Sequence, residues 1–122
     1  MKEKILFVNS CVRGENESRT LALAKTALSR LDGDIEEIRL ADADLKPLDA
    51  AGLAKRAESA EKNDFSDPVY DCAKQFAACD TVVIAAPFWD YSFPAFLKIY
   101  IESLCVGGLT FLYGSDGVPI SY

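Results

Sequence analysis

The sequence predicts an α/β fold in which helices wind around both faces of a parallel sheet. Two short runs, residues 4–9 and 81–86, are almost wholly apolar, as is typical of parallel strands buried on both faces. Helical patterns alternate with strand patterns along the chain, which indicates a doubly wound sheet. A length of 122 residues allows one domain with one core, so we expect residues 1–122 to form a single domain.

The first half of the chain alternates strand and helix signals. Ser18 is a good N-cap for a helix, and Gly33 is expected to end that helix. Its apolar positions recur at helical spacing, at Leu21, Ala24, Leu28 and Leu31. Residues 35–40 predict a second strand, which is more polar and therefore nearer an edge of the sheet. Residues 50–61, rich in Ala, Lys and Glu, predict a short exposed helix.

The second half predicts two more helices and a hairpin. Asp67 and Pro68 are typical of a helix N-cap and first helical position. The helix that follows carries one apolar stripe, formed by Val69, Cys72, Ala73, Phe76 and Ala77. A helix over residues 94–105 is apolar nearly all round, which favours burial, for example against a partner subunit. Residues 110–113 and 118–122 flank a glycine-containing turn and predict a hairpin.

Composition excludes several classes of function. The net charge of −6 argues against a general nucleic-acid surface. No apolar run approaches the roughly 20 residues of a membrane span. The first residues lack the long apolar segment of a signal peptide, so we expect a cytoplasmic protein. Because the chain has no histidine and no CxxC pair, no metal site is expected.

The four cysteines fall into two groups. Cys72, Cys79 and Cys105 lie in apolar stretches, which are typical of buried free thiols. Cys11 lies in a polar loop, where a reactive thiol is the alternative to a plain structural role.

A ligand is expected where two loops meet at one end of the sheet. In an open parallel sheet, ligands bind outside the carboxyl ends of the strands, at the point where the strand order reverses. With strand order 2-1-3, that point lies between strands one and three, and the loops there are residues 10–18 and 87–93. The first loop carries hydroxyl, amide and arginine groups and runs into a helix N-terminus, which favours phosphate. The alternative is a capped helix after a solvated loop.

The second loop carries four aromatic side chains within six residues. Such groups can pack on a planar ring system while the backbone bonds its edge. The alternative is that Phe88, Trp89 and Phe93 cap the core or an interface. A phosphate site and an aromatic platform at one switch point together favour a flavin, and FMN supplies both chemical groups.

At these residues the chain resembles a known family. Residues 4–10, Arg13 and 17–20, and more specifically 80–94 with its continuation to Phe111, are similar to flavodoxin-fold NAD(P)H:quinone oxidoreductases and FMN-dependent NADH-azoreductases. The resemblance implies a flavodoxin-like three-layer sandwich with a parallel sheet of order 2-1-3. It also implies that a hydride passes from NADH or NADPH through FMN to a quinone or azo acceptor. Since the flavin carries that chemistry, no catalytic side chain is required.

The resemblance also assigns the site residues. The FMN phosphate would be held by Ser10, Asn16, Glu17 and Ser18. The isoalloxazine would lie against Pro87, Phe88, Trp89, Asp90 and Tyr91, partly through their backbone groups. Phe111, on the hairpin, would lie on the substrate side of the flavin.

The chain departs from the family in its extent. Compared with the family, we expect it to be truncated after strand three plus a short hairpin and to lack the family's fourth and fifth strands. Strand 81–86 would then be a bare edge, which is an aggregation liability. We therefore expect another part of a longer polypeptide, or another chain, to complete the sheet. A homodimer or larger assembly would form through helix 94–105 or the edge of strand 81–86.

Two alternatives to the oxidoreductase stay open. One is a non-catalytic flavodoxin-like protein that binds FMN and transfers electrons, with which an acidic surface agrees. The other is a self-associating fragment without activity of its own.

Overall fold

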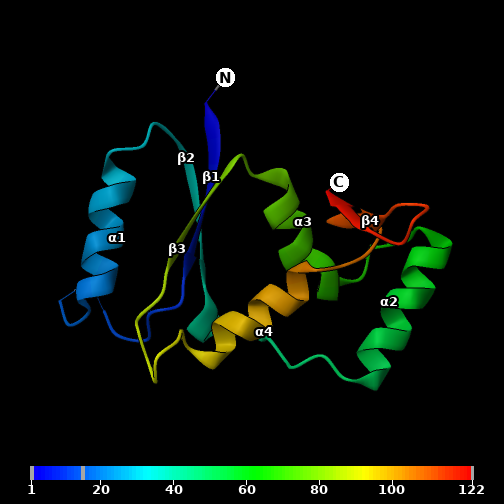
Figure 1. The fold of residues 1–122 in the computed structure, drawn as a ribbon. Helices are drawn as coiled ribbons and strands as arrows, with labels where there is room; N and C mark the ends of the chain where they lie inside the picture. Colours follow the sequence, from blue (N-terminus) through cyan, green and yellow to red (C-terminus); the bar gives the residue numbers. More distant parts are fainter. Residues whose placement is uncertain (1, 15, 122) are drawn as a thin grey trace. The chain divides into compact units, whose positions relative to one another are not determined.

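The computed structural model describes residues 2–14 and 16–121, and the chain divides into two compact units. The first unit comprises Met1–Leu45 and Ala78–Lys98, and the second comprises Lys46–Ala77 and Ile99–Tyr122. The expected end of the hairpin at Tyr122 lies outside the described residues. Figure 1 shows the elements in chain order.

The first unit is built on a parallel sheet with strand order β2-β1-β3, which confirms the predicted order (Figure 1). Its strands are β1 (Glu3–Asn9), β2 (Gly33–Arg39) and β3 (Thr81–Ala85). The five residues from Ile5 to Asn9 are all buried, so both faces of β1 are covered. Within the described chain β3 pairs with β1 alone. It is therefore an edge strand, and its Ile84 is 49% exposed.

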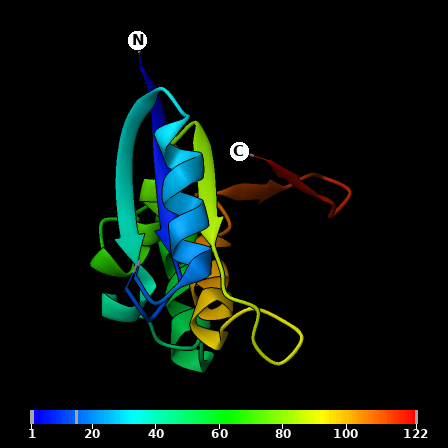
Figure 2. The same ribbon diagram turned by 90° about the vertical axis from the view of Figure 1, so that its left-hand side faces the viewer.

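Helix α1 (Arg19–Ser29) crosses one face of this sheet, as Figure 2 shows. The predicted positions Leu21, Ala24 and Leu28 are buried, and they pack in one cluster with Ile5, Phe7, Cys11 and Ala85. The Ser18 side chain accepts a hydrogen bond from the backbone N–H of Leu21, as expected for an N-cap.

The expected helix end at Gly33 is wrong. The helix ends at Ser29, Leu31 is 39% exposed, and Gly33 is the first residue of β2. A Cβ at Gly33 would lie 2.5 Å from the backbone oxygen of Glu3. Glycine is therefore needed because β1 and β2 approach closely there.

The sequence did not predict the 3-10 helix η1 (Leu40–Asp42), whose Leu40 was expected in the second strand. The other elements agree with prediction to within a few residues. They are α2 (Ala50–Lys62), the 3-10 helix η2 (Pro68–Tyr70), α3 (Asp71–Ala78), α4 (Ala95–Leu104), β4 (Phe111–Tyr113) and β5 (Pro119–Ser121). The helix expected to begin at Pro68 opens with a 3-10 turn, and Asp67 caps it by accepting from the Val69 N–H at 2.9 Å. Val69 is 59% exposed, so it does not belong to the apolar stripe assigned to it.

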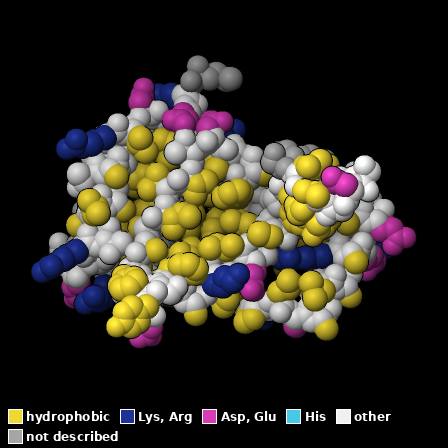
Figure 3. Space-filling view, viewed as in Figure 1, with side chains coloured by type: hydrophobic (Ala, Val, Ile, Leu, Met, Phe, Trp, Pro, Cys, Tyr) yellow, Lys and Arg dark blue, Asp and Glu magenta, His cyan; other side chains and the backbone are white. Residues whose placement is uncertain are grey.

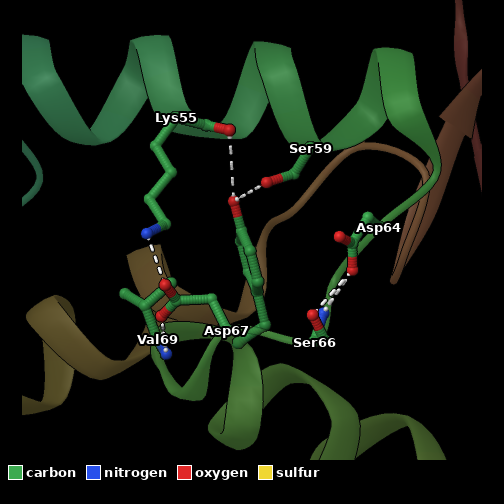
Figure 4. A network of polar contacts seen from close by, with 7 residues as sticks. Lys55, Ser59, Asp64, Ser66, Asp67 and Val69 are labelled. Carbon is green, nitrogen blue, oxygen red and sulfur yellow. Dashed lines mark hydrogen bonds and ion pairs between the residues drawn. The ribbon is translucent and has the colours of Figure 1, made fainter.

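The second unit contains a polar network beside a small apolar cluster (Figure 4). Tyr70 is 2% exposed, and its hydroxyl lies 2.8 Å from the hydroxyl of Ser59 on α2. Lys55 forms an ion pair with Asp67, and Ser66 donates to Asp64 at 2.7 Å. The network borders an open pocket of about 280 Å³. Because these charged groups are paired with one another, the network ties α2 to η2.

The cysteines differ from the sequence-based expectation. Cys11 is buried, with 3% of its surface exposed, because it packs in the α1–β1 cluster. Cys105 is exposed although it follows an apolar helix. Partial burial raises the pKa of the Cys72 and Cys79 thiols, which favours their protonated form.

Among the described helices, none has the combination of length and apolar character that crossing a membrane requires.

Candidate functional site

The two loops predicted to hold a ligand leave the sheet at one point. Ser10, the first residue after β1, donates its backbone N–H to the carbonyl oxygen of Ala85 at 3.0 Å. The Ser10 hydroxyl donates to the same oxygen at 2.5 Å. Ala85 is the last residue of β3. The structure therefore brings the loops after β1 and β3 together at the carboxyl edge of the sheet, as the sequence predicted.

The first loop ends in a tight turn that begins α1. The carbonyl oxygen of Gly14 accepts hydrogen bonds from the N–H groups of Glu17 at 3.0 Å and Ser18 at 2.9 Å. Asn16 and Glu17 are exposed, whereas Ser10 and Ser18 are buried. The Ser18 oxygen accepts from Leu21 N–H at 3.1 Å, and its own O–H donates to none of the residues that the structure describes. This hydroxyl lies at the positive end of the α1 dipole, where an anion is favoured.

The second loop contains a two-residue turn with an unusual backbone. Trp89 and Ser92 each donate a backbone N–H to the carbonyl oxygen of the other, and both distances are 2.8 Å. Between them, Asp90 and Tyr91 have φ angles of 49° and 64°. Two consecutive left-handed residues form a type I′ turn, a conformation that glycine, asparagine or aspartate usually supplies, so Tyr91 is the unusual residue here. The loop therefore stores strain of order 1–3 kcal/mol per residue, and such strain is common at functional sites.

The turn displays its aromatic side chains to solvent. Phe88 is 75% exposed and Tyr91 is 93% exposed, and their rings meet edge to face with centroids 6.1 Å apart. Trp89 and Phe93 are each 41% exposed. Phe88 therefore does not cap the core of the described chain, whereas Trp89 and Phe93 are each more than half buried. Figure 3 shows hydrophobic side chains gathered on the face where β3 and this loop lie.

The other predicted positions are also placed. Pro87 is partly buried and Asp90 is exposed at the turn. Phe111, predicted for the substrate side, belongs to the second unit and lies at the start of β4. Its ring meets that of Tyr113 edge to face, with centroids 5.2 Å apart.

Sequence reasoning missed three polar residues that support the first loop. Asn9 is 1% exposed, and its side-chain oxygen accepts from the Cys11 N–H at 2.9 Å. Its amide nitrogen donates to Glu37 at 3.2 Å, and Glu37 pairs with Lys25 at 3.1 Å. Asn9 could have been noticed as a polar residue that ends an apolar strand. Glu37 and Lys25 carried no such signal, because each looks like an ordinary surface charge in the sequence.

The ionisation of Glu37 reflects this arrangement. Partial burial by itself would raise its pKa. Hydrogen bonds from Asn9 and Lys25, together with the positive charges of Lys25 and Arg39, outweigh burial and lower the pKa of the carboxyl group overall. Glu37 is therefore held as a carboxylate facing Asn9.

A β2-β1-β3 parallel sheet with its loops gathered at one carboxyl edge defines an α/β protein with a flavodoxin-like fold. The chain belongs to the Flavodoxin_2 family, a family described by its flavodoxin-like fold, whose model matches residues 3–121.

Relatives with named activities are similar over most of this chain. An FMN-dependent NADH:quinone oxidoreductase from Clostridium perfringens (strain SM101 / Type A) is 32% identical over 119 residues, which cover 93% of this chain and 60% of the relative. A second such oxidoreductase, from Clostridium acetobutylicum, is 33% identical over 120 residues, covering 93% of this chain and 59% of the relative. The chain thus spans about 60% of the length of the relatives that it matches.

Solved structures agree on the fold. An azoreductase from Bacillus anthracis strain Sterne superposes with a TM-score of 0.75 at 24% identity, covering 98% of this chain and 63% of the azoreductase. An FMN-dependent NADH-azoreductase from Bacillus anthracis strain Ames Ancestor, solved in complex with FMN, gives a TM-score of 0.76 at 21% identity, with the same coverage. At these identities the likeness concerns the fold.

Proposed function

We propose that the protein containing this chain is an FMN-dependent oxidoreductase that passes a hydride from NADH or NADPH through the flavin to a quinone or azo acceptor. The observation that carries the proposal is the junction at Ser10 and Ala85, which joins an anion-favouring helix start to an exposed aromatic turn. FMN has a phosphate for the first and a planar ring for the second. The names of the relatives support the same activity.

The first loop is proposed to hold the phosphate. Asn16 and Glu17 are exposed just before α1, and the Ser18 O–H, which has no acceptor among the described residues, can donate there. The Ser10 hydroxyl is bonded to Ala85 in this structure, so it would have to turn to reach a phosphate oxygen. The dipole of an 11-residue helix adds a favourable field.

The second loop is proposed to hold the ring. Phe88, Trp89 and Tyr91 offer exposed aromatic surface, and Pro87 and Asp90 set the backbone around them. When bound, FMN supplies the hydride chemistry, so these residues orient the ring and limit access of water. Phe111 is proposed to contact the acceptor.

Titration with FMN and with riboflavin tests the proposal. Riboflavin has the same ring but no phosphate, so the two ligands separate the contributions of the two loops. We expect the full 122-residue chain to quench FMN fluorescence on binding and to bind riboflavin more weakly. A chain that leaves the fluorescence of both ligands unchanged would exclude a flavin site in it.

An electron carrier is the second candidate, because the net charge of −6 agrees with an acidic carrier surface. Activity discriminates the two. A reductase oxidises NADH in the presence of a quinone, whereas a carrier binds FMN without accepting hydride from NADH.

Assembly and location complete the proposal. A homodimer or larger assembly would form through the open edge of β3, where Ile84 is 49% exposed, or through helix α4.

A cytoplasmic location is consistent with the free cysteines Cys11, Cys72, Cys79 and Cys105, since free thiols are typical of reducing compartments. A self-associating chain that retains no flavin would instead favour the inactive-fragment alternative.

A further inference from the structure

We propose that Asn9 is a positioning residue for the proposed phosphate loop, and that Glu37 and Lys25 orient its side chain. The identity of the ligand, FMN, rests on the proposed function. The role of Asn9 in positioning the loop rests on the geometry of the first unit. Asn9 does not touch the ligand in this account. It determines where the chain goes when it leaves β1.

The Asn9 side chain spans the junction between the strand and the loop. Its Oδ1 accepts from the backbone N–H of Cys11 at 2.9 Å, which turns the chain immediately after β1. Its Nδ2 donates to Oε2 of Glu37 at 3.2 Å. Because Asn9 is 1% exposed, a lost partner could not be replaced by bulk water.

Glu37 is placed for this contact by the register of the sheet. It pairs with Phe7 across the parallel β1–β2 ladder, and Phe7 and Asn9 lie two residues apart on one face of β1. Helix α1 covers that face, and Lys25 reaches from it to Oε1 of Glu37 at 3.1 Å. The Lys25 ammonium also lies 5.3 Å from the centre of the Phe7 ring. Two strands and a helix thus converge on one carboxylate.

The donors and acceptors of the hydrogen bonds around Asn9 can be assigned in only one way. A carboxylate can only accept hydrogen bonds, so the side of Asn9 that faces Glu37 must be its NH₂ group. The carbonyl oxygen of Asn9 is then directed to the Cys11 N–H. Lys25 satisfies the other carboxylate oxygen and thereby helps to hold Glu37 in place. The charge on Glu37 therefore determines which atom of Asn9 meets the loop.

A swap of donor and acceptor tests the direction. In the Asn9→Asp variant a second carboxylate faces Glu37. Repulsion between the two carboxylates should rotate the new side chain and break its hydrogen bond with the Cys11 N–H. In the double variant Asn9→Asp/Glu37→Gln, the glutamine NH₂ can donate to the new aspartate and its oxygen can accept from Lys25. The swap therefore restores every hydrogen bond, with one carboxylate retained in the pair.

Two readouts are measured on the full chain. Hydrogen exchange of the Cys11 backbone amide, followed by NMR, reports the loop without any ligand. The dissociation constants of FMN and riboflavin report the phosphate contribution. We expect Asn9→Asp to speed Cys11 exchange and to weaken FMN binding by about 10-fold each. Riboflavin binding should change little, and the double variant should recover most of both losses.

Two further variants, at exposed residues of β2, test the proposal if the Asn9→Asp variant does not fold. Glu37→Lys presents a donor to the Asn9 NH₂ and should speed Cys11 exchange. Asp34→Lys makes the same change of charge on the opposite face of β2 and should leave the exchange rate unaltered.

The outcomes separate the two proposals. If the swap does not recover Cys11 exchange, or if Glu37→Lys and Asp34→Lys behave alike, the positioning role of Asn9 is wrong. If the exchange pattern holds but the unmodified chain binds no FMN, the orientation of the loop stands and the proposed ligand is wrong.

Discussion

Ser10 directs both its backbone N–H and its hydroxyl onto the carbonyl oxygen of Ala85. The contact joins two residues that are 75 positions apart in the chain, one directly after β1 and the other at the end of β3. This contact therefore fixes the distance between the points where the loops after β1 and β3 begin, and a ligand that bridges the loops must match that distance. The contribution of each loop to ligand binding can be tested separately by substitutions in that loop.

Relief of the strained turn should separate stability from binding. Tyr91→Gly places the residue that best tolerates φ of 64° at that position, so we expect stability to rise by about 1 kcal/mol. FMN binding should weaken at the same time, because the exposed ring is lost. Thermal unfolding and FMN titration measure the two effects. Unchanged affinity would remove Tyr91 from the site, and Asp90→Gly serves as the control that alters the same turn without removing an aromatic group.

A substitution at Ser18 can keep the N-cap of α1 and add a negative charge at that position. Ser18→Asp retains a good cap, so stability should stay close to that of the parent chain, whereas the added carboxylate should repel phosphate and weaken FMN binding. Ser18→Ala should instead lower the free energy of unfolding by about 1 kcal/mol. Urea unfolding and FMN titration distinguish the two variants. Equal FMN affinity in Ser18→Asp and the parent chain would place the phosphate elsewhere.

The buried hydroxyl pair in the second unit should behave as a coupled unit. Tyr70→Phe leaves Ser59 without that partner, and we expect a loss of about 1–2 kcal/mol in the free energy of unfolding. Ser59→Ala should cost a similar amount. The double variant should lose less than the sum of the single losses, because no orphaned hydroxyl remains. Strictly additive losses in urea unfolding would show that the pair contributes no coupling.

The lowered pKa of Glu37 predicts an acid-sensitive contribution to stability. Its folded pKa lies below the ordinary value of 4.5, so the contribution is complete above that value and is lost as the pH falls through the folded pKa. Glu37→Gln should therefore flatten the fall in unfolding temperature between about pH 5 and 3. Asp67→Asn, which alters another carboxyl group with a lowered pKa, is the comparison in the second unit.

Two isoleucines on opposite edges of the sheet test the proposed assembly. Ile84 on β3 is 49% exposed and Ile35 on β2 is 46% exposed. If β3 is the interface, Ile84→Lys should reduce self-association in sedimentation velocity, whereas Ile35→Lys should not. Both variants change one half-exposed residue to the same side chain, so a general effect of charge would appear in both. Such a shared effect would argue against the β3 edge.

Much of the fold could be predicted from local patterns. The apolar run of β1 and the cap and stripe of α1 depend on residues close together in the sequence, and they were predicted correctly except for Leu31, which lies beyond the end of α1. The candidate loops followed from the order of the strands. The conformation of the second loop did not, because Tyr91 is not a residue type that indicates a left-handed position, although Asp90 is.

The sequence by itself determined the alternation of strands and helices, because this depends on the order and periodicity of apolar residues. The 2-1-3 strand order and the two loops that a ligand would meet followed from the resemblance to the flavodoxin-fold family. Only the tertiary structure decided that Cys11 is buried, that Gly33 opens β2 and that Asn9 faces Glu37. Each of these depends on atoms brought together from distant parts of the chain. Their distances arise from the register of β1 against β2 and the packing of α1, which a one-dimensional pattern does not contain.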